Sequence, residues 1–249
     1  MSQDTAADRY FDTAIAALRA VQESQREALA AAIDLVVEAI AAGRQIFSFG
    51  ASHSFMLTEE LVYRTGGLML INPIAPQGMN LFVRPVNLTS RLERVVGLGT
   101  ELLLASPVAA GDVVLVASVS GRNAVAIDLC LAARERGAKL IAITSLAYTH
   151  SVTSRHPSGQ KVHELCDVVL DNGAPAGDAA VTIEGFEQAV GPLSTVTGCA
   201  LVNALVCGVV EQLTARGIEP PVFMSANVDG GDAYNARLLA AHRERIHYL

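Results

Sequence analysis

The run Asp112–Ser118, with the sequence DVVLVAS, constrains the fold more than any other part of the chain. Its apolar residues fall on both faces of a strand, which is the pattern of a central parallel strand that is covered on both sides. Similar apolar runs, separated by segments whose apolar residues have helical spacing, occupy residues 45–49, 68–71, 139–144 and 167–170. This alternation predicts a parallel sheet with helices on both of its faces.

The length and composition suit one large α/β domain. The chain has 249 residues, of which 51% are hydrophobic and only 5% aromatic, enough to bury a sizeable core. We predict a single domain over residues 1–249, with its core at about 30–215, a helical N-terminal extension at 5–42 and a C-terminal segment at 218–249. The spacing of apolar residues also predicts helices at 55–64, 101–105, 123–136, 194–215 and 235–246.

Charge and composition argue against several kinds of partner. The formal net charge is −7 and there is no basic tract, so we expect no nucleic acid. The longest apolar stretch, around Cys199–Val210, contains Asn203 and is too short to span a membrane. The polar first ten residues are unlike a signal peptide, so we expect a cytoplasmic protein. The cysteines form no CxxC pair and the histidines no HExxH, so we expect no metal and no cofactor.

Two polar loops stand where the ligands of open parallel sheets bind. Such ligands lie beyond the carboxyl ends of the strands, where the strand order reverses. Ser52–Ser54 follows the first predicted strand, and Ser118–Asn123 follows the third. The sequence therefore predicts that the chemistry of this protein lies between these two loops.

The second loop has the donors that a phosphate monoester needs. Ser118 and Ser120 supply hydroxyls two residues apart, and Gly121 permits a tight turn. The amides that follow point away from a helix start, where the helix dipole favours an anion, and Arg122 or Asn123 can close around it. The alternative is a plain turn in which a serine caps the helix.

Three stretches, Phe49–Ser54, Ser118–Asn123 and Pro192–Thr195, resemble the SIS (sugar isomerase) family of phosphosugar-binding domains. The first is similar to that family's Gly-Thr-Ser or Gly-x-Gly-x-Ser turn, the second to its Ser-x-Ser-Gly-x-x-Thr phosphate loop, and the third to the Ser-Thr turn before its last core helix. The resemblance covers about residues 30–215. It implies a flavodoxin-like three-layer α/β/α sandwich on a five-stranded parallel sheet, and a homodimer or homotetramer.

Within that family the chain is most similar to a branch of single-domain proteins of about this length, related to phosphoheptose isomerase. The likeness runs nearly end to end and rests on residues 53–54, 59–60, 64–67, 154–159, 171–173 and 221–231. It brings no known reaction with it.

The resemblance implies roles for particular side chains. Four of them would hold the phosphate of a sugar phosphate: Ser52, Ser118, Ser120 and Asn123. Ser54, Gly121 and Arg122 are further candidates for substrate binding from the same two loops. Ser194 and Thr195 would reach the sugar. Asn123 stands where Thr or Ser is usual in the family, and its amide can still donate.

Aldose–ketose isomerisation needs a base on carbon and a group that carries protons between oxygens. We expect Glu60 to be the base, because Glu59–Glu60 resembles a pair in phosphoheptose isomerases whose second glutamate has that role. The alternative is an i,i+4 ion pair of Glu60 with Arg64 on the surface.

Two histidines are candidates for the acid–base group. His53 lies in the first loop, and His156 lies in a basic polar loop after the fourth strand that could close over a sugar. For each, the alternative is an ordinary solvated loop residue. The histidine that phosphoheptose isomerases carry on the last core helix is missing from residues 196–213, so His53 or His156 would replace it.

These features predict a phosphosugar-binding protein that acts as an aldose–ketose isomerase on a phosphorylated sugar or amino sugar. Amino-sugar phosphate deaminases use similar proton chemistry, whereas an etherase is less expected, because residues 124–136 lack its glutamate signature. The rival from another class is a phosphosugar sensor without catalysis. The position of Glu60 separates them: a carboxylate in the cavity favours catalysis, and an ion pair with Arg64 favours binding alone.

Overall fold

The computed structural model describes residues 5–249. Residues 1–4, which belong to the predicted domain and to its polar first ten residues, lie outside the described part. Within it, a parallel sheet has the strand order β2-β1-β3-β4-β5. The strands are β1 (Ile46–Gly50), β2 (Ile71–Pro73), β3 (Val113–Ala117), β4 (Lys139–Thr144) and β5 (Val168–Asp171). β1 lies beside both β2 and β3, so the strand order reverses there.

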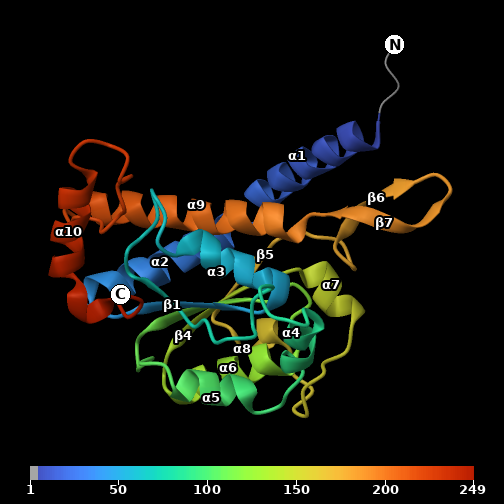
Figure 1. The fold of residues 1–249 in the computed structure, drawn as a ribbon, viewed down its shortest axis with the longest axis horizontal. Coiled ribbons are helices and arrows are strands. Elements are labelled where there is room, and N and C mark those ends of the chain that lie inside the picture. Colours follow the sequence, from blue (N-terminus) through green and yellow to red (C-terminus); the bar gives the residue numbers. More distant parts are fainter. Residues whose placement is uncertain (1–4) are drawn as a thin grey trace.

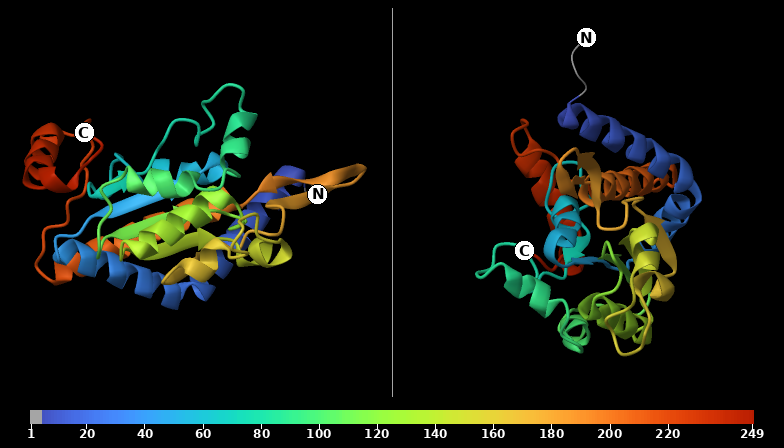
Figure 2. Two further views of the ribbon diagram at one scale, coloured as in Figure 1. Left: turned by 90° about the horizontal axis from the view of Figure 1, so that it is seen from below. Right: turned by 90° about the vertical axis from the view of Figure 1, so that its right-hand side faces the viewer.

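Helices cover both faces of this sheet (Figures 1 and 2). One face carries α2 (Arg26–Ala41), α3 (Phe55–Leu61) and α9 (Ser194–Ala215), and the other carries α5 (Leu98–Leu104), α6 (Ala124–Glu135) and α8 (Val162–Leu165). The predicted three-layer α/β/α fold is therefore confirmed.

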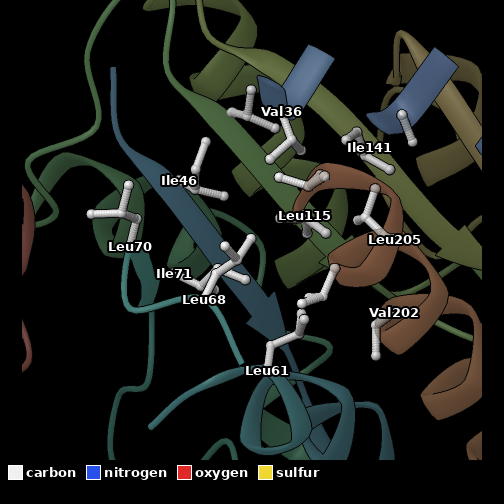
Figure 3. Close-up of a cluster of buried hydrophobic side chains, with 14 of the residues drawn as sticks. Val36, Ile46, Leu61, Leu68, Leu70, Ile71, Leu115, Ile141, Val202 and Leu205 are labelled. Carbon is white, nitrogen blue, oxygen red and sulfur yellow. The ribbon is translucent and has the colours of Figure 1, made fainter. Parts of the chain in front are cut away.

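The side chains of the strands alternate between the two layers, as the strand geometry requires. Ile46 and Leu115 point to the layer of α2 and α9, where they pack with Val36 and Leu205 (Figure 3). Phe47, like its neighbours on that side of the sheet, belongs to a second core under α5 and α6. Two separate cores hold the sheet rigid, so the loops at its carboxyl edge are fixed at their bases.

The N-terminal extension is two helices, α1 (Ala6–Ser24) and α2, that break at Gln25. Thr5 and Asp8 form a capping box at the start of α1, which satisfies otherwise free backbone amides. α1 leaves the body of the molecule and runs beside the end of α9 (Figure 1).

A hairpin that the sequence analysis did not predict lies beside α1. β6 (Ala179–Ile183) and β7 (Phe186–Pro192) pair in antiparallel fashion, and Gly185 turns between them at φ +79°. Its residues are mostly exposed and its apolar spacing is irregular, so the period that identifies a buried strand is absent.

Several predicted boundaries were shifted. The predicted strand 68–71 appears as β2 at 71–73, because Leu68 and Met69 bond instead to the C-terminal segment, with the Met69 amide 2.7 Å from the Pro221 oxygen. The predicted last helix, 235–246, is α10 (Gly231–Ala241) followed by a short turn at Arg243–Arg245. Two short helices, α4 (Asn87–Leu92) and α7 (Leu146–Ser151), were not predicted from the sequence.

α9 is the one helix in the described residues that is long and apolar enough to cross a membrane by those two measures alone. Its inner residues, among them Leu201, Leu205 and Val209, are buried in the core against the sheet. Its apolar character therefore has a structural cause within the fold.

Candidate functional site

A cavity of about 300 Å³ opens at the carboxyl ends of β1 and β3, where the strand order reverses. Both loops that the sequence analysis singled out line it, and so does a segment before α5. The lining residues are Ala51, Ser52, His53, Ser54, Glu93, Ala117, Ser118, Val119, Ser120, Asn123, Val125, Ala126 and Tyr148. The volume is at the lower end of the range for small-molecule sites.

The first loop is held in a strained conformation by close backbone contacts. Ser52 has a left-handed backbone at φ +57°, which is costly for a residue with a side chain, and its amide donates to the Met79 oxygen at 2.6 Å. Gly50 before it has no room for a side chain, since a Cβ there would lie 2.3 Å from the Ser54 oxygen. Strain of this kind persists where the surrounding structure enforces it, and it is common at binding sites.

The second loop turns tightly at Gly121, which has φ +61°. A Cβ at this position would lie 2.9 Å from Thr149 Oγ1, and that hydroxyl donates to the Ser120 oxygen at 2.9 Å. The loop then enters α6 at Asn123, so the start of the helix faces the cavity.

Four serines line the cavity, and Ser52 hydrogen-bonds the Glu93 carboxylate through its side chain, whereas the other three have no partner in the part of the chain that the structure describes. Within residues 5–249, no hydrogen bond engages the side-chain oxygen of Ser54, Ser118 or Ser120. The three side chains are half-buried, so their hydroxyls are available to hydrogen-bond a ligand in the cavity. Three hydroxyls beside a helix start suit a phosphate dianion.

Glu93 is the residue of the cavity that the sequence analysis missed. It lies just after α4, and its carboxylate accepts a short hydrogen bond from Asn123 Nδ2. Burial raises the pKa of the Glu93 carboxyl above its usual value, although hydrogen bonds from Asn123 and Ser52 and the nearby charges of Arg94 and Arg155 oppose the shift. A single glutamate in an irregular, arginine-rich segment carries no local signal that it faces a cavity.

Asn123 bridges two charged groups. Its Nδ2 donates to Glu93, and its Oδ1 accepts from Arg155 Nη1 at 2.9 Å. Burial and the positive charges of Arg122 and Arg94 lower the pKa of Arg155. Arg122 and Arg94 therefore disfavour the charge of Arg155, and an anion bound nearby would offset their effect.

His156 does not reach the cavity. Its Nε2 lies 2.9 Å from Asp128 Oδ1 on α6, its Nδ1 lies 2.8 Å from Ser158 Oγ, and its side chain is only 9% exposed. The loop expected to act as a lid is thereby fastened to α6. Arg122 turns toward this loop, with Nη2 3.4 Å from Thr153 Oγ1, and is not among the residues that line the cavity.

Glu60 also lies away from the cavity. Its carboxylate forms an ion pair with Arg64 one turn on, and accepts from Asn203 Nδ2 on α9 at 2.6 Å. This is the alternative arrangement that the sequence left open. His53, by contrast, lines the cavity, where its ring is exposed and has no hydrogen-bond partner within residues 5–249.

The start of α9 is likewise separate from the cavity. Ser194 Oγ donates to Asp178 Oδ2 at 2.6 Å, and the Ser194 amide donates to Asp178 Oδ1 at 2.7 Å. The hydroxyl is therefore used to fasten the hairpin to the helix. Thr195 does not line the cavity either.

The geometry defines a class of protein: an α/β protein with a polar cavity at the switch point of its sheet, lined by serine hydroxyls from two loops. Across residues 5–249, no three His, Cys, Asp or Glu side chains gather in a way that could hold a metal ion. The sequence model of the SIS domain matches residues 9–145, more than half of the chain. The chain belongs to the SIS domain family.

Known proteins agree with this membership. A UPF0309 protein of Shouchella clausii is 44% identical over 242 residues, which cover 97% of this chain and 98% of that one. The structure of phosphoheptose isomerase from Neisseria gonorrhoeae has a TM-score of 0.56 at 17% identity and covers 82% of this chain and 97% of its own. The Vibrio vulnificus NanR protein, solved in complex with ManNAc-6P, has a TM-score of 0.54 at 18% identity, covering 85% of this chain and 65% of its own. At these identities the structural likeness shows the shared fold.

Proposed function

We propose that this protein binds a phosphorylated sugar or amino sugar in the cavity between Ser52–Ser54 and Ser118–Asn123, and isomerises it between aldose and ketose. The observation that carries the proposal is the set of unpartnered hydroxyls at the switch point of the sheet. Membership of the SIS family supports it, as does the fold shared with a phosphoheptose isomerase.

The reaction balances without a redox partner. A base takes the proton from C2, and the electron pair of that C–H bond forms the C1–C2 double bond of an enediol. The carbonyl oxygen on C1 gains a proton as the C2 hydroxyl loses one, and C1 then receives the proton held by the base. His53 is placed to carry the proton between the two oxygens, because its exposed ring lines the cavity and has no competing partner within residues 5–249.

One observation favours a phosphosugar sensor as the second candidate. Glu60, the base expected from the sequence, is paired with Arg64 and does not line the cavity. A sensor would bind the same phosphate on the same serines without moving a proton. A deaminase of amino-sugar phosphates would share the first proton transfer with the isomerase.

The test separates binding from catalysis. Melting temperature is measured with glucose 6-phosphate, N-acetylglucosamine 6-phosphate, ribose 5-phosphate and sedoheptulose 7-phosphate, each beside its unphosphorylated sugar. A sugar phosphate at 100 times its Kd stabilises the protein by about 2.7 kcal/mol. The best binder is then incubated in D₂O, and exchange of the proton beside its carbonyl group, on C2 of an aldose or on C1 of a ketose, is followed by NMR. Exchange with conversion between aldose and ketose supports the isomerase, binding without exchange supports the sensor, and no binding by any phosphate ester refutes the phosphate site.

We also propose a homodimer or homotetramer in the cytoplasm. Large apolar side chains are exposed on α1 and the hairpin, with Phe11 66% and Phe186 56% exposed. Exposed apolar groups on adjacent elements are typical of an interface between copies. Light scattering of the purified protein measures the mass directly, and a monomer at micromolar concentration contradicts this expectation.

A further inference from the structure

We propose that Glu93 is the base that takes the proton from the substrate carbon. This assignment rests on the proposed function and identifies the residue that would perform its central step. Glu93 touches the cavity that holds the free serine hydroxyls, whereas Glu60 does not. No other glutamate or aspartate is among the residues that line that cavity.

The position of Glu93 is fixed by the helix that starts at the phosphate loop. Its carbonyl accepts from the Val125 amide at 3.1 Å, and its carboxylate accepts from Asn123 Nδ2, so two positions at the α6 start hold it. Four residues further on, the Gly97 amide donates to Asp128 Oδ2 on α6 at 2.7 Å. The phosphate loop and the Glu93 carboxylate are therefore both held by the start of α6. Proton transfer to a bound substrate needs such a fixed geometry.

The guanidinium of Arg155 is directed at Asn123 and not at the Glu93 carboxylate. Asp128 Oδ1 lies 2.9 Å from His156 Nε2, which fastens the following loop to α6, and Arg155 of that loop bonds to Asn123 rather than to Glu93. Asn123 thus stands between the carboxylate and the guanidinium. The side chain of Ser52, which lines the same cavity, also hydrogen-bonds the Glu93 carboxylate, so Glu93 is in direct contact with the first loop of the site.

The surroundings of Glu93 make its carboxylate a stronger base than that of an exposed glutamate. Burial raises the pKa of its carboxyl, so it binds a proton more firmly than an exposed glutamate does. A base whose pKa lies closer to the working pH accepts a proton from carbon more readily. In the proposed reaction Glu93 takes the C2 proton, the C–H electron pair enters the C1–C2 double bond, and Glu93 returns the proton to C1.

The test uses the full-length protein and the C2 proton of glucose 6-phosphate and N-acetylglucosamine 6-phosphate in D₂O. Four proteins are compared: the wild type, Glu93→Gln, Glu60→Gln and, as a matched control on the surface of α5, Glu101→Gln. Glu93→Gln is expected to keep its melting temperature and its stabilisation by the sugar phosphate, and to lose C2 exchange by about 100-fold or more, the usual contribution of a general base. Glu93→Asp, which keeps the charge and shortens the reach, is expected to recover part of the rate.

The outcomes separate this assignment from the proposed function. Wild-type-like exchange by Glu93→Gln overturns the assignment and leaves the reaction standing. Loss of C2 exchange in Glu60→Gln but not in Glu93→Gln would make Glu60 the base and would also overturn the assignment of Glu93. Binding by the wild type with no exchange overturns Glu93 as a base while the phosphate site survives, and absence of binding overturns the phosphate site itself. The assignment of Glu93 as the base would be supported by a fall of the wild-type exchange rate at low pH that is absent in Glu93→Gln.

Discussion

Two regions of this protein carry the residues that its sequence marked for function, and they differ in how their polar groups are satisfied. In the cavity between β1 and β3, the hydroxyls of Ser54, Ser118 and Ser120 have no partner within residues 5–249. At the junction of α3 and α9, Ser194 is bonded to Asp178, and Glu60 to Arg64 and Asn203. The difference teaches that a family-like motif does not by itself place a serine or glutamate in the cavity, because folding can give its side chain a protein partner elsewhere.

The largest effect that we expect is on the affinity for a phosphosugar, and it tests whether the free hydroxyls of the cavity bind the ligand. Replacing Ser118 and Ser120 together by alanine removes two hydroxyls that have no partner within the described residues. A hydrogen bond to a charged group is worth about 1.5–3 kcal/mol, so we expect Kd to rise by roughly 100-fold or more. Calorimetric titration with the best-binding sugar phosphate measures this.

Ser194→Ala is the counterpart from the other region. Its hydroxyl and Asp178 are partly buried together, so its loss should lower the free energy of unfolding by about 1–3 kcal/mol. Affinity should fall far less than in the double variant. Urea unfolding of both proteins measures the stabilities, and an equal loss of affinity in the two would erase the distinction between the regions.

A second prediction compares two glycines with positive φ. Gly121→Ala places a Cβ 2.9 Å from Thr149 Oγ1, so it should shift the phosphate loop and weaken sugar phosphate binding by roughly tenfold, or about 1.4 kcal/mol. Gly177 has φ +83°, and nothing lies within 4 Å of the place that a Cβ would take there. Gly177→Ala should cost about 1 kcal/mol of stability from strain, with affinity kept. Similar affinities for the two variants would show that the geometry of the loop is not needed for binding.

A third prediction compares two asparagines that each donate to a glutamate. Asn123→Ala leaves Glu93 without this side-chain donor and should slow C2 exchange by about 10- to 100-fold through misplacement of the carboxylate. Asn203→Ala does the same to Glu60 and should leave the exchange rate within about twofold. NMR exchange at saturating and limiting sugar phosphate separates kcat from KM. A larger loss in Asn203→Ala would contradict the assignment of the base.

The smallest expected effect is on stability as a function of pH. Because burial raises the pKa of Glu93, the folded protein keeps the proton at pH values where the unfolded chain has released it. The wild type should therefore lose stability relative to Glu93→Gln as pH rises from the ordinary pKa of glutamate through the raised one. The change should stay below about 1 kcal/mol, because the side chain is only partly buried. Urea unfolding between about pH 4 and 7.5, with Glu101→Gln in parallel, would reveal it, and an opposite slope would contradict the raised pKa.

Much of the fold was predictable because its signals are local. A strand such as Val113–Ala117 that is apolar on both faces can only be buried between two layers, and the loops that follow such strands must meet at one edge. The hairpin 179–192 and the shift of β2 toward Ile71 were missed, because exposure and pairing with the distant C-terminal segment leave no periodic pattern. The class of fold therefore followed from short-range spacing, whereas edge positions depended on long-range contacts.

The sequence by itself determined that this chain forms a parallel α/β sandwich and that Ser52–Ser54 and Ser118–Asn123 lie at its switch point. The tertiary structure alone decided which acidic residue faces them. Glu60 stands beside a motif and is drawn into an ion pair with Arg64, while Glu93 has no motif and is held at the cavity by Asn123, 30 residues away. The physical reason is that a polar side chain takes the partner that folding places nearest. Residues close in sequence do not reveal that partner when it comes from another element.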